Sequence, residues 1–175
     1  MTTTTALTEK AYWFAWKYHG DIYHKRKYTG EPYIFHPVNV ALTLRSVGIT
    51  DEHVIAAAFL HDTVEDTEVT LDMIQEEFGT RVHDMIKALS DDPFIEGVSP
   101  NRAARKKMDR ERLGAASADV HNIKVADLID NSVSIIEHDP KFAKVRAHNI
   151  FYFASCFVVH SNIDLFPRVN STSKC

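Results

Sequence analysis

The stretch VIAAAFLHDTVEDTEV, residues 54–69, decides the fold. Its first seven residues are apolar on nearly all sides of a helix, which predicts a buried central helix rather than a surface helix. His61 and Asp62 end this apolar run, where an unpaired charge is costly unless a partner or a cation compensates it. Because imidazole nitrogens and carboxylate oxygens both bind divalent cations, we predict that His61 and Asp62 are metal ligands.

A His-Asp dipeptide alone is weak evidence, because this chain contains three of them. His83-Asp84 lies in an ordinary amphipathic helical pattern. His138-Asp139 precedes Pro140, at a predicted helix end where a histidine suits the helix dipole. We interpret both of these pairs as structural.

Helical patterns continue on both sides of the central stretch, and no strand-like alternation of useful length appears. We predict an all-α fold with a single domain over residues 1–165 and a flexible tail over 166–175. Loops are predicted at HKRKYTGEPYIFHP, residues 24–37, and at TVEDTEV, residues 63–69. Beside the central helix, which Asp51 can cap, the predicted helices cover residues 7–18, 37–48, 70–79, 82–89, 101–113, 120–138 and 141–160.

Composition narrows the class of protein and partner. The 175 residues carry a net charge of −4, which excludes the uniform basic field of most nucleic-acid binders but allows a small anionic substrate. Cys156 and Cys175 do not suggest a disulfide, the N-terminus lacks a secretory pattern, and the longest apolar run is about half a membrane span. We therefore expect a cytoplasmic protein with no nucleic-acid or membrane partner.

Further polar residues suit a metal-dependent phosphate site. His36, at the exit of the first loop, and Asp127, in an apolar helix, are candidates for the remaining metal ligands. Glu65 and Asp66 follow His61-Asp62 by four residues, so continued helical turning would bring them near the metal, to orient or deprotonate its water. A solvated acidic loop is the alternative interpretation.

Basic residues suited to phosphate lie in two places. Arg26 and Lys27 precede His36 in the loop, and Lys124 shares a helix face with Asp127. The neutral Asn131 lies on the same face, where its amide can donate to or accept from a bound nucleotide. A second basic cluster is better interpreted as a solvated face balanced by nearby acids; it comprises Arg102, Arg105, Lys106, Lys107, Arg110 and Arg112.

Together these pieces resemble the hydrolase domain of RelA/SpoT proteins, and especially the small alarmone hydrolases. The resemblance rests on RKYTGEPYIFHPVNVA, AAAFLHDTVEDTEVTLDMIQEEFGTRV and IKVADLIDN, at residues 26–41, 56–82 and 123–131. It implies an all-helical HD fold in which Mn²⁺ is held by His36, His61, Asp62 and Asp127. A set of two imidazoles and two carboxylates also accepts Zn²⁺ or Fe²⁺. The resemblance also implies that Glu65 and Asp66 position and activate the water.

The resemblance implies nucleotide contacts from Arg26, which would pack on the base, and from Lys27 and Asn131. The implied reaction removes the 3′-pyrophosphate of (p)ppGpp by attack of a metal-activated water, leaving GDP or GTP. Three alternatives stay open: an NADPH or other nucleotide 2′- or 3′-phosphatase, a 5′-nucleotidase or dNTP triphosphohydrolase, and an HD module that binds nucleotide without turnover.

The chain departs from the family pattern in three places. Leu128 stands where many members have arginine or lysine, and the region between Ser90 and Ala118 keeps only the basic character of the family. The last predicted helix is almost uniformly apolar, in NIFYFASCFVV at residues 149–159. Because such a patch usually needs covering, we expect homo-oligomerisation.

Overall fold

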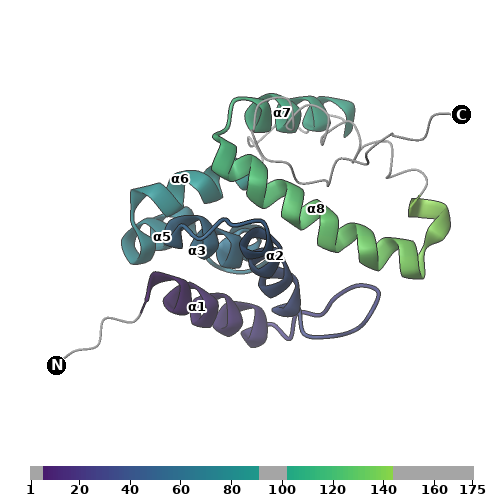
Figure 1. Ribbon diagram of the computed structural model, residues 1–175, viewed down its shortest axis with the longest axis horizontal. Coiled ribbons are helices and arrows are strands. Elements are labelled where there is room, and N and C mark those ends of the chain that lie inside the picture. The colour runs from purple at the N-terminus through teal and green to yellow at the C-terminus, as the bar shows by residue number, and fades with distance from the viewer. Residues whose placement is uncertain (1–5, 91–101, 144–175) are drawn as a thin grey trace, which may run out of the picture.

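The computed structural model describes residues 6–90 and 102–143, and within these ranges the fold is all-α, as predicted. The described residues form no strand ladder, only one isolated antiparallel bridge between Lys25 and Pro32. Figure 1 shows the long helix α8 crossing the molecule, with α7 on one side of it and α1 to α3 on the other. The helices are α1 (Leu7–Asp21), α2 (Phe35–Ser46), α3 (Glu52–Leu60), α4 (Thr63–Asp66), α5 (Leu71–Phe78), α6 (Thr80–Leu89), α7 (Arg102–Gly114) and α8 (Ala118–His138).

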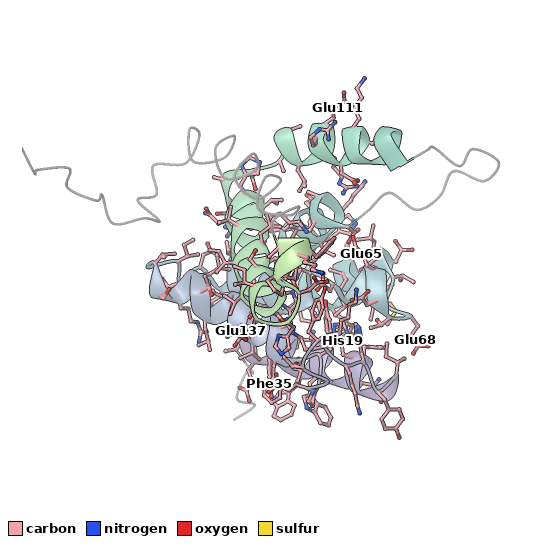
Figure 2. All side chains as sticks on the ribbon, turned by 90° about the vertical axis from the view of Figure 1, so that its right-hand side faces the viewer. His19, Phe35, Glu65, Glu68, Glu111 and Glu137 are labelled. Atoms are coloured by element: carbon pink, nitrogen blue, oxygen red, sulfur yellow. The ribbon has the colours of Figure 1, made fainter. Side chains whose placement is uncertain are left out.

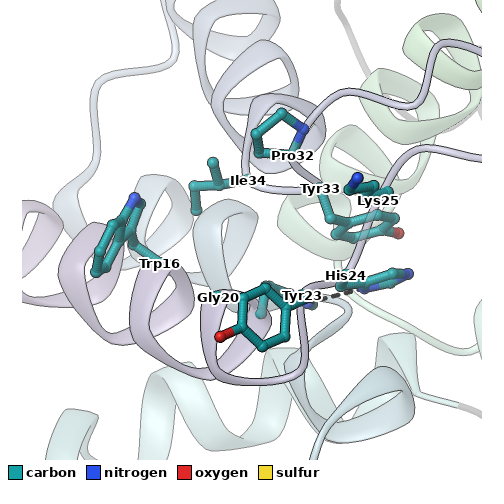
Figure 3. A pocket seen from close by; sticks show the side chains of 9 residues that line it. Trp16, Gly20, Tyr23, His24, Lys25, Pro32, Tyr33 and Ile34 are labelled. Carbon is teal, nitrogen blue, oxygen red and sulfur yellow. Dashed lines mark hydrogen bonds between the residues drawn. The ribbon is translucent and has the colours of Figure 1, made fainter.

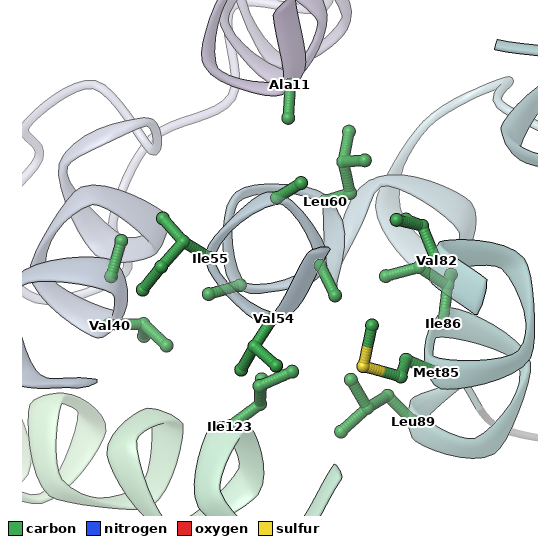
Figure 4. Close-up of a cluster of buried hydrophobic side chains, with 14 of the residues drawn as sticks. Ala11, Val40, Val54, Ile55, Leu60, Val82, Met85, Ile86, Leu89 and Ile123 are labelled. Atoms are coloured by element: carbon green, nitrogen blue, oxygen red, sulfur yellow. The ribbon is translucent and has the colours of Figure 1, made fainter. Parts of the chain in front are cut away.

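Helix α3 lies at the centre of the core, which confirms the prediction made from its apolar sequence. It packs against α1, α2, α6 and α8, and its residues from Val54 to Ala58 are all buried. Figure 4 views α3 along its axis, ringed by side chains of those four helices: Ala11, Val40, Val82, Ile86 and Ile123. A helix surrounded in this way holds its C-terminal end, where His61 follows, in one place.

Polar caps fix where α3 and α5 begin. The Asp51 side chain accepts hydrogen bonds from the backbone N–H groups of His53 and Val54, and the Thr70 hydroxyl accepts one from Met73. Both caps satisfy N–H groups that have no partner inside the helix. Gly79 then separates α5 from α6 with a φ of +80°, a left-handed conformation that favours glycine.

Several predicted helix boundaries were off by two or three residues, and two of the differences have a clear physical reason. Helix α2 begins at Phe35 rather than at Pro37, because the first turn of a helix leaves its N–H groups unpaired and so tolerates proline at the third position. Residues 63–66, predicted as a loop, form the short helix α4. There the Thr63 hydroxyl donates to the Leu60 carbonyl at 2.7 Å, and the Thr67 hydroxyl donates to the Thr63 carbonyl at 2.6 Å.

Several sequence-based predictions fall on residues that the structure does not describe. The last predicted helix, 141–160, is helical over residues 141–143, and the rest of it, its apolar segment and the tail lie beyond the described residues. The predicted domain limits and homo-oligomerisation therefore stay predictions. Within residues 6–90 and 102–143, no helix combines the length and apolarity that crossing a membrane requires.

Candidate active site

Three parts of the chain bring the four predicted metal ligands together. His36 lies in the first turn of α2, His61 and Asp62 connect α3 to α4, and Asp127 lies on α8. One ligand atom from each of His36, His61 and Asp62 falls within 4.8 Å of the others. The Asp62 Oδ2 atom is 3.1 Å from His61 Nε2 and 3.4 Å from His36 Nε2, and Asp127 Oδ1 is 3.2 Å from His36 Nε2.

The two histidines present buried nitrogens that suit a cation. The Nδ1 atom of His61 bonds to the Ala58 carbonyl at 2.9 Å, and that of His36 bonds to Asp130 at 2.7 Å. Both Nε2 atoms are buried and have no hydrogen-bond partner among the described residues, although the carboxylates lie near them. A buried polar atom without a partner is costly, so this arrangement fits a divalent cation bound by imidazole and carboxylate groups.

The charges of the cluster support the same conclusion. Burial opposes protonation of His36, but the neighbouring carboxylates of Asp127, Asp130 and Asp62 outweigh it and raise its pKa to about 10. Burial likewise opposes protonation of His61, but the charge of Asp62 raises its pKa. Both imidazoles therefore lie in a strongly negative environment, which a divalent cation would balance.

The two carboxylates of the cluster also resist protonation. Burial alone would raise the pKa of Asp62, but the charge of His61 and the nearby His36 imidazole hold it well below its usual value. For Asp127, burial is outweighed by the charge of Lys124 and by the nearby His36 imidazole, which lower its pKa. Both groups therefore offer ionised oxygens at neutral pH.

Lys124 and Asn131, predicted to contact substrate, both contact Asp127 in the structure. The Lys124 Nζ atom is 2.8 Å from Asp127 Oδ2, and the Asn131 amide donates to Asp127 Oδ1 at 2.5 Å. This follows from their spacing, since residues three and four apart on a helix are neighbours. In this arrangement, both side chains hold the Asp127 carboxylate.

Arg26 and Lys27, the two basic residues of the loop, differ in their surroundings. The Arg26 guanidinium forms an ion pair with Asp130 at 2.6 Å, and its side chain is only 10 % exposed. Lys27 is exposed, with its Nζ atom 5.2 Å from the centre of the Tyr28 ring. Lys27 is therefore the member of the pair that remains accessible from solvent.

Glu65 and Asp66 lie on α4, immediately after the cluster, because the chain resumes helical turning after Asp62. The Asp66 carboxylate is 3.9 Å from His24 Nδ1, and burial and the nearby charge of Asp62 raise its pKa. A carboxylate with a raised pKa is a better proton acceptor than an ordinary one. Glu65 is exposed at the surface of the same turn (Figure 2).

Sequence reasoning missed Tyr33 and Asp130, which both contact cluster residues. The Tyr33 hydroxyl donates to Asp62 Oδ2 at 2.5 Å, and Asp130 accepts from His36. The PYI sequence around Tyr33 is part of the family resemblance, so a signal for it was present. Nothing in the sequence pairs Asp130 with His36, which lies 94 residues earlier.

A cavity of about 240 Å³ lies between α1 and the loop, with Tyr33 in its lining. Trp16, Tyr23 and Tyr33 are among its lining residues, and Figure 3 shows His24 below the Tyr33 ring. The His24 and Tyr33 rings are stacked, with centroids 3.8 Å apart. Tyr33 thus faces the cavity and also reaches Asp62.

The features that the sequence analysis interpreted as structural have ordinary structural contacts. His83 Nδ1 lies 2.8 Å from its neighbour Asp84 on α6, and His138 Nδ1 bonds to the Ser134 carbonyl at the end of α8. On α7, the exposed Lys107 pairs with Glu111, which agrees with a balanced surface face. Arg112 was wrongly assigned to that face: it pairs with Asp109, but its side chain is only 16 % exposed and its Nε donates to the Ala88 carbonyl at the end of α6. Figure 2 shows Glu111 on the side of α7 away from the other helices. Side chains at positions 102–106, including Arg102, Arg105 and Lys106, lie outside the description.

Comparisons with known proteins show which family the chain resembles. The family model described as an HD domain matches residues 11–150. The guanosine-3′,5′-bis(diphosphate) 3′-pyrophosphohydrolase of Aquifex aeolicus is 41 % identical over 125 residues, which is 70 % of this chain but 17 % of that protein. The human enzyme of the same name, MESH1, is 39 % identical over 128 residues, covering 72 % of this chain and 69 % of MESH1.

Solved structures show the same likeness. A metazoan ortholog of SpoT that hydrolyses ppGpp superposes with a TM-score of 0.71 at 28 % identity, covering 91 % of this chain and 87 % of that one. A Listeria monocytogenes protein gives a TM-score of 0.63, also at 28 % identity, covering 81 % of this chain and 90 % of that one.

Proposed function

This chain belongs to the HD-domain family, and from that membership we propose that it is a metal-dependent guanosine-3′,5′-bis(diphosphate) 3′-pyrophosphohydrolase. One observation carries the proposal: the unpartnered Nε2 atoms of His36 and His61 face the carboxylates of Asp62 and Asp127. The names of the relatives from Aquifex aeolicus and human support the choice of (p)ppGpp as substrate.

We propose that the cation is Mn²⁺ and that its ligands are His36, His61, Asp62 and Asp127. The mixture of two imidazoles and two carboxylates also suits Zn²⁺ and Fe²⁺. A bound divalent cation supplies Lewis-acid charge that acidifies water and stabilises negative charge on phosphate oxygens. Lys124 and Asn131 would keep the Asp127 carboxylate oriented towards it.

The reaction consumes one water. The water oxygen joins the phosphorus attached to the ribose 3′ oxygen, the bond to that oxygen breaks, and pyrophosphate leaves while the ribose oxygen takes a proton. Glu65 and Asp66, on the turn after Asp62, would orient the water and take up its proton. Lys27, exposed in the loop, would pair with the phosphates of the nucleotide.

The direct test offers purified protein and Mn²⁺ three substrates in parallel: ppGpp, NADPH and a dNTP. We expect turnover of ppGpp to GDP and pyrophosphate, resolved by ion-exchange chromatography. Release of phosphate from NADPH without ppGpp turnover would replace the alarmone with a different nucleotide. No turnover of any substrate would favour a binding module.

Glu65→Gln is expected to lower kcat for ppGpp by about 10²-fold, because the amide cannot accept the proton of water. The Kd for Mn²⁺ should stay close to the wild-type value, since Glu65 is not one of the proposed ligands. Glu68→Gln is the matched control, because Glu68 is exposed on the segment just after α4. Equal kcat values for the two variants would remove Glu65 from the reaction.

A further inference from the structure

Asp130 lies on α8 at the border between the metal cluster and the loop that carries Arg26. It follows Asp127 by three residues, so the two carboxylates lie on neighbouring parts of one helix face. Its side chain is only 12 % exposed. A carboxylate this sheltered needs several hydrogen bonds to remain ionised.

Three donors from two other elements satisfy Asp130. Its Oδ2 atom accepts from the His36 Nδ1 atom at 2.7 Å and from the Arg26 guanidinium at 2.6 Å. Its Oδ1 atom accepts from the Asn39 amide at 2.8 Å. The carboxylate therefore joins the loop, α2 and α8, and Arg26 balances its charge.

The contact with Asp130 determines how His36 presents its other nitrogen. Nδ1–H donates to Asp130, so a cation that displaces the second proton would meet the lone pair of Nε2, which points towards Asp62 and Asp127. His61 has an equivalent anchor, because its Nδ1 atom bonds to the Ala58 carbonyl. Each ring is thus held through Nδ1, one by a backbone carbonyl and the other by a side chain.

We propose that Asp130 is a positioning residue for His36 and that Arg26 supports it by neutralising the charge of the Asp130 carboxylate. This inference rests on the proposed metal site. Partners that hold the second nitrogen of a ligating histidine fix its orientation and increase its affinity for the ion. Here the partner comes from a helix far along the chain, and its counter-ion comes from the loop before His36.

The test is the Kd for Mn²⁺, measured by titration calorimetry on the full chain. Asp130→Ala should weaken Mn²⁺ binding by about 10- to 100-fold, the usual effect of losing such a partner. Asp130→Asn should recover most of the affinity, because its amide oxygen can still accept from His36 while Asn39 turns its own amide. Asp84→Ala, on the exposed surface of α6, is the matched control and should bind Mn²⁺ as the wild type does.

A second pair of variants guards against misfolding, because Asp130→Ala alone leaves Arg26 without its counter-ion. Arg26→Ala and the double variant Arg26→Ala/Asp130→Ala differ only in Asp130, so the double variant should again bind Mn²⁺ more weakly. Wild-type affinity in a folded Asp130→Ala chain would overturn the inference. Equal weakening by alanine and asparagine would overturn it too, because charge rather than the hydrogen bond would then be responsible. If the wild type itself binds no Mn²⁺, the proposed metal site fails, which is a different result.

Discussion

Replacing Asp62 with asparagine is expected to lower kcat/KM for ppGpp by about 10³-fold. The amide keeps the size of the side chain but loses the negative charge that lies between the two buried imidazoles. The substitution also removes negative charge that favours the protonated imidazoles, since Asp62 raises the pKa of both His36 and His61. The variant should therefore bind Mn²⁺ more weakly as well as turn over more slowly.

Initial rates with ppGpp at saturating Mn²⁺, together with a Mn²⁺ titration, measure the two effects. Asp84→Asn is the matched control, because it changes the aspartate of another His-Asp pair that lies on the surface of α6. We expect Asp84→Asn to match the wild type in both measurements. A wild-type rate and Kd in Asp62→Asn would exclude Asp62 from the metal site.

Ile55→Ala should have the largest effect on stability, lowering the free energy of unfolding by about 2–5 kcal/mol. Ile55 is 1 % exposed at the centre of α3, where the ring of helices in Figure 4 leaves little room to collapse around a cavity. A loss of that size is a large part of the about 5–15 kcal/mol that keeps a typical domain folded.

Urea unfolding of the metal-free protein, followed by circular dichroism, measures this loss as a lower midpoint with an unchanged slope. Leu42→Ala makes a similar change on α2 at a side chain that is 55 % exposed. We expect the control to stay within about 0.5 kcal/mol of the wild type. A similar loss in both variants would mean that α3 is not the centre of stability.

The sequence predicted most helices because their signals are local. The apolar run of α3, the caps at Asp51 and Thr70 and the glycine at position 79 each act within a few residues. The misplaced boundaries at Phe35 and Thr63 show where local rules are weak. Proline is tolerated throughout the first turn of a helix, so it does not fix where α2 begins. A threonine hydroxyl that bonds a backbone carbonyl can stabilise a short helix such as α4, which has little apolar pattern.

The candidate site was less accessible to sequence reasoning because its contacts join distant residues. His61 and Asp62 stood out by contrast with their apolar neighbours, whereas His36 and Asp127 became a set with them only through the family resemblance. Arg26 could be recognised as a charge, but its partner Asp130 is 104 residues further along the chain. Its ion pair with Asp130 depends on how the loop meets α8, which no local pattern encodes.

The spread of the cluster over α2, the α3–α4 junction and α8 links ion binding to the unfolding equilibrium of the whole domain. His36 and Asp127 are 91 positions apart (127 minus 36), so an ion held by both would close a chain loop that spans most of the described residues. An ion that binds only the folded chain adds RT ln(1 + [M]/Kd) to its stability. Resistance to heat and to proteolysis would then vary with the supply of free cation, and the lifetime of the protein would report on the same ion that its chemistry needs.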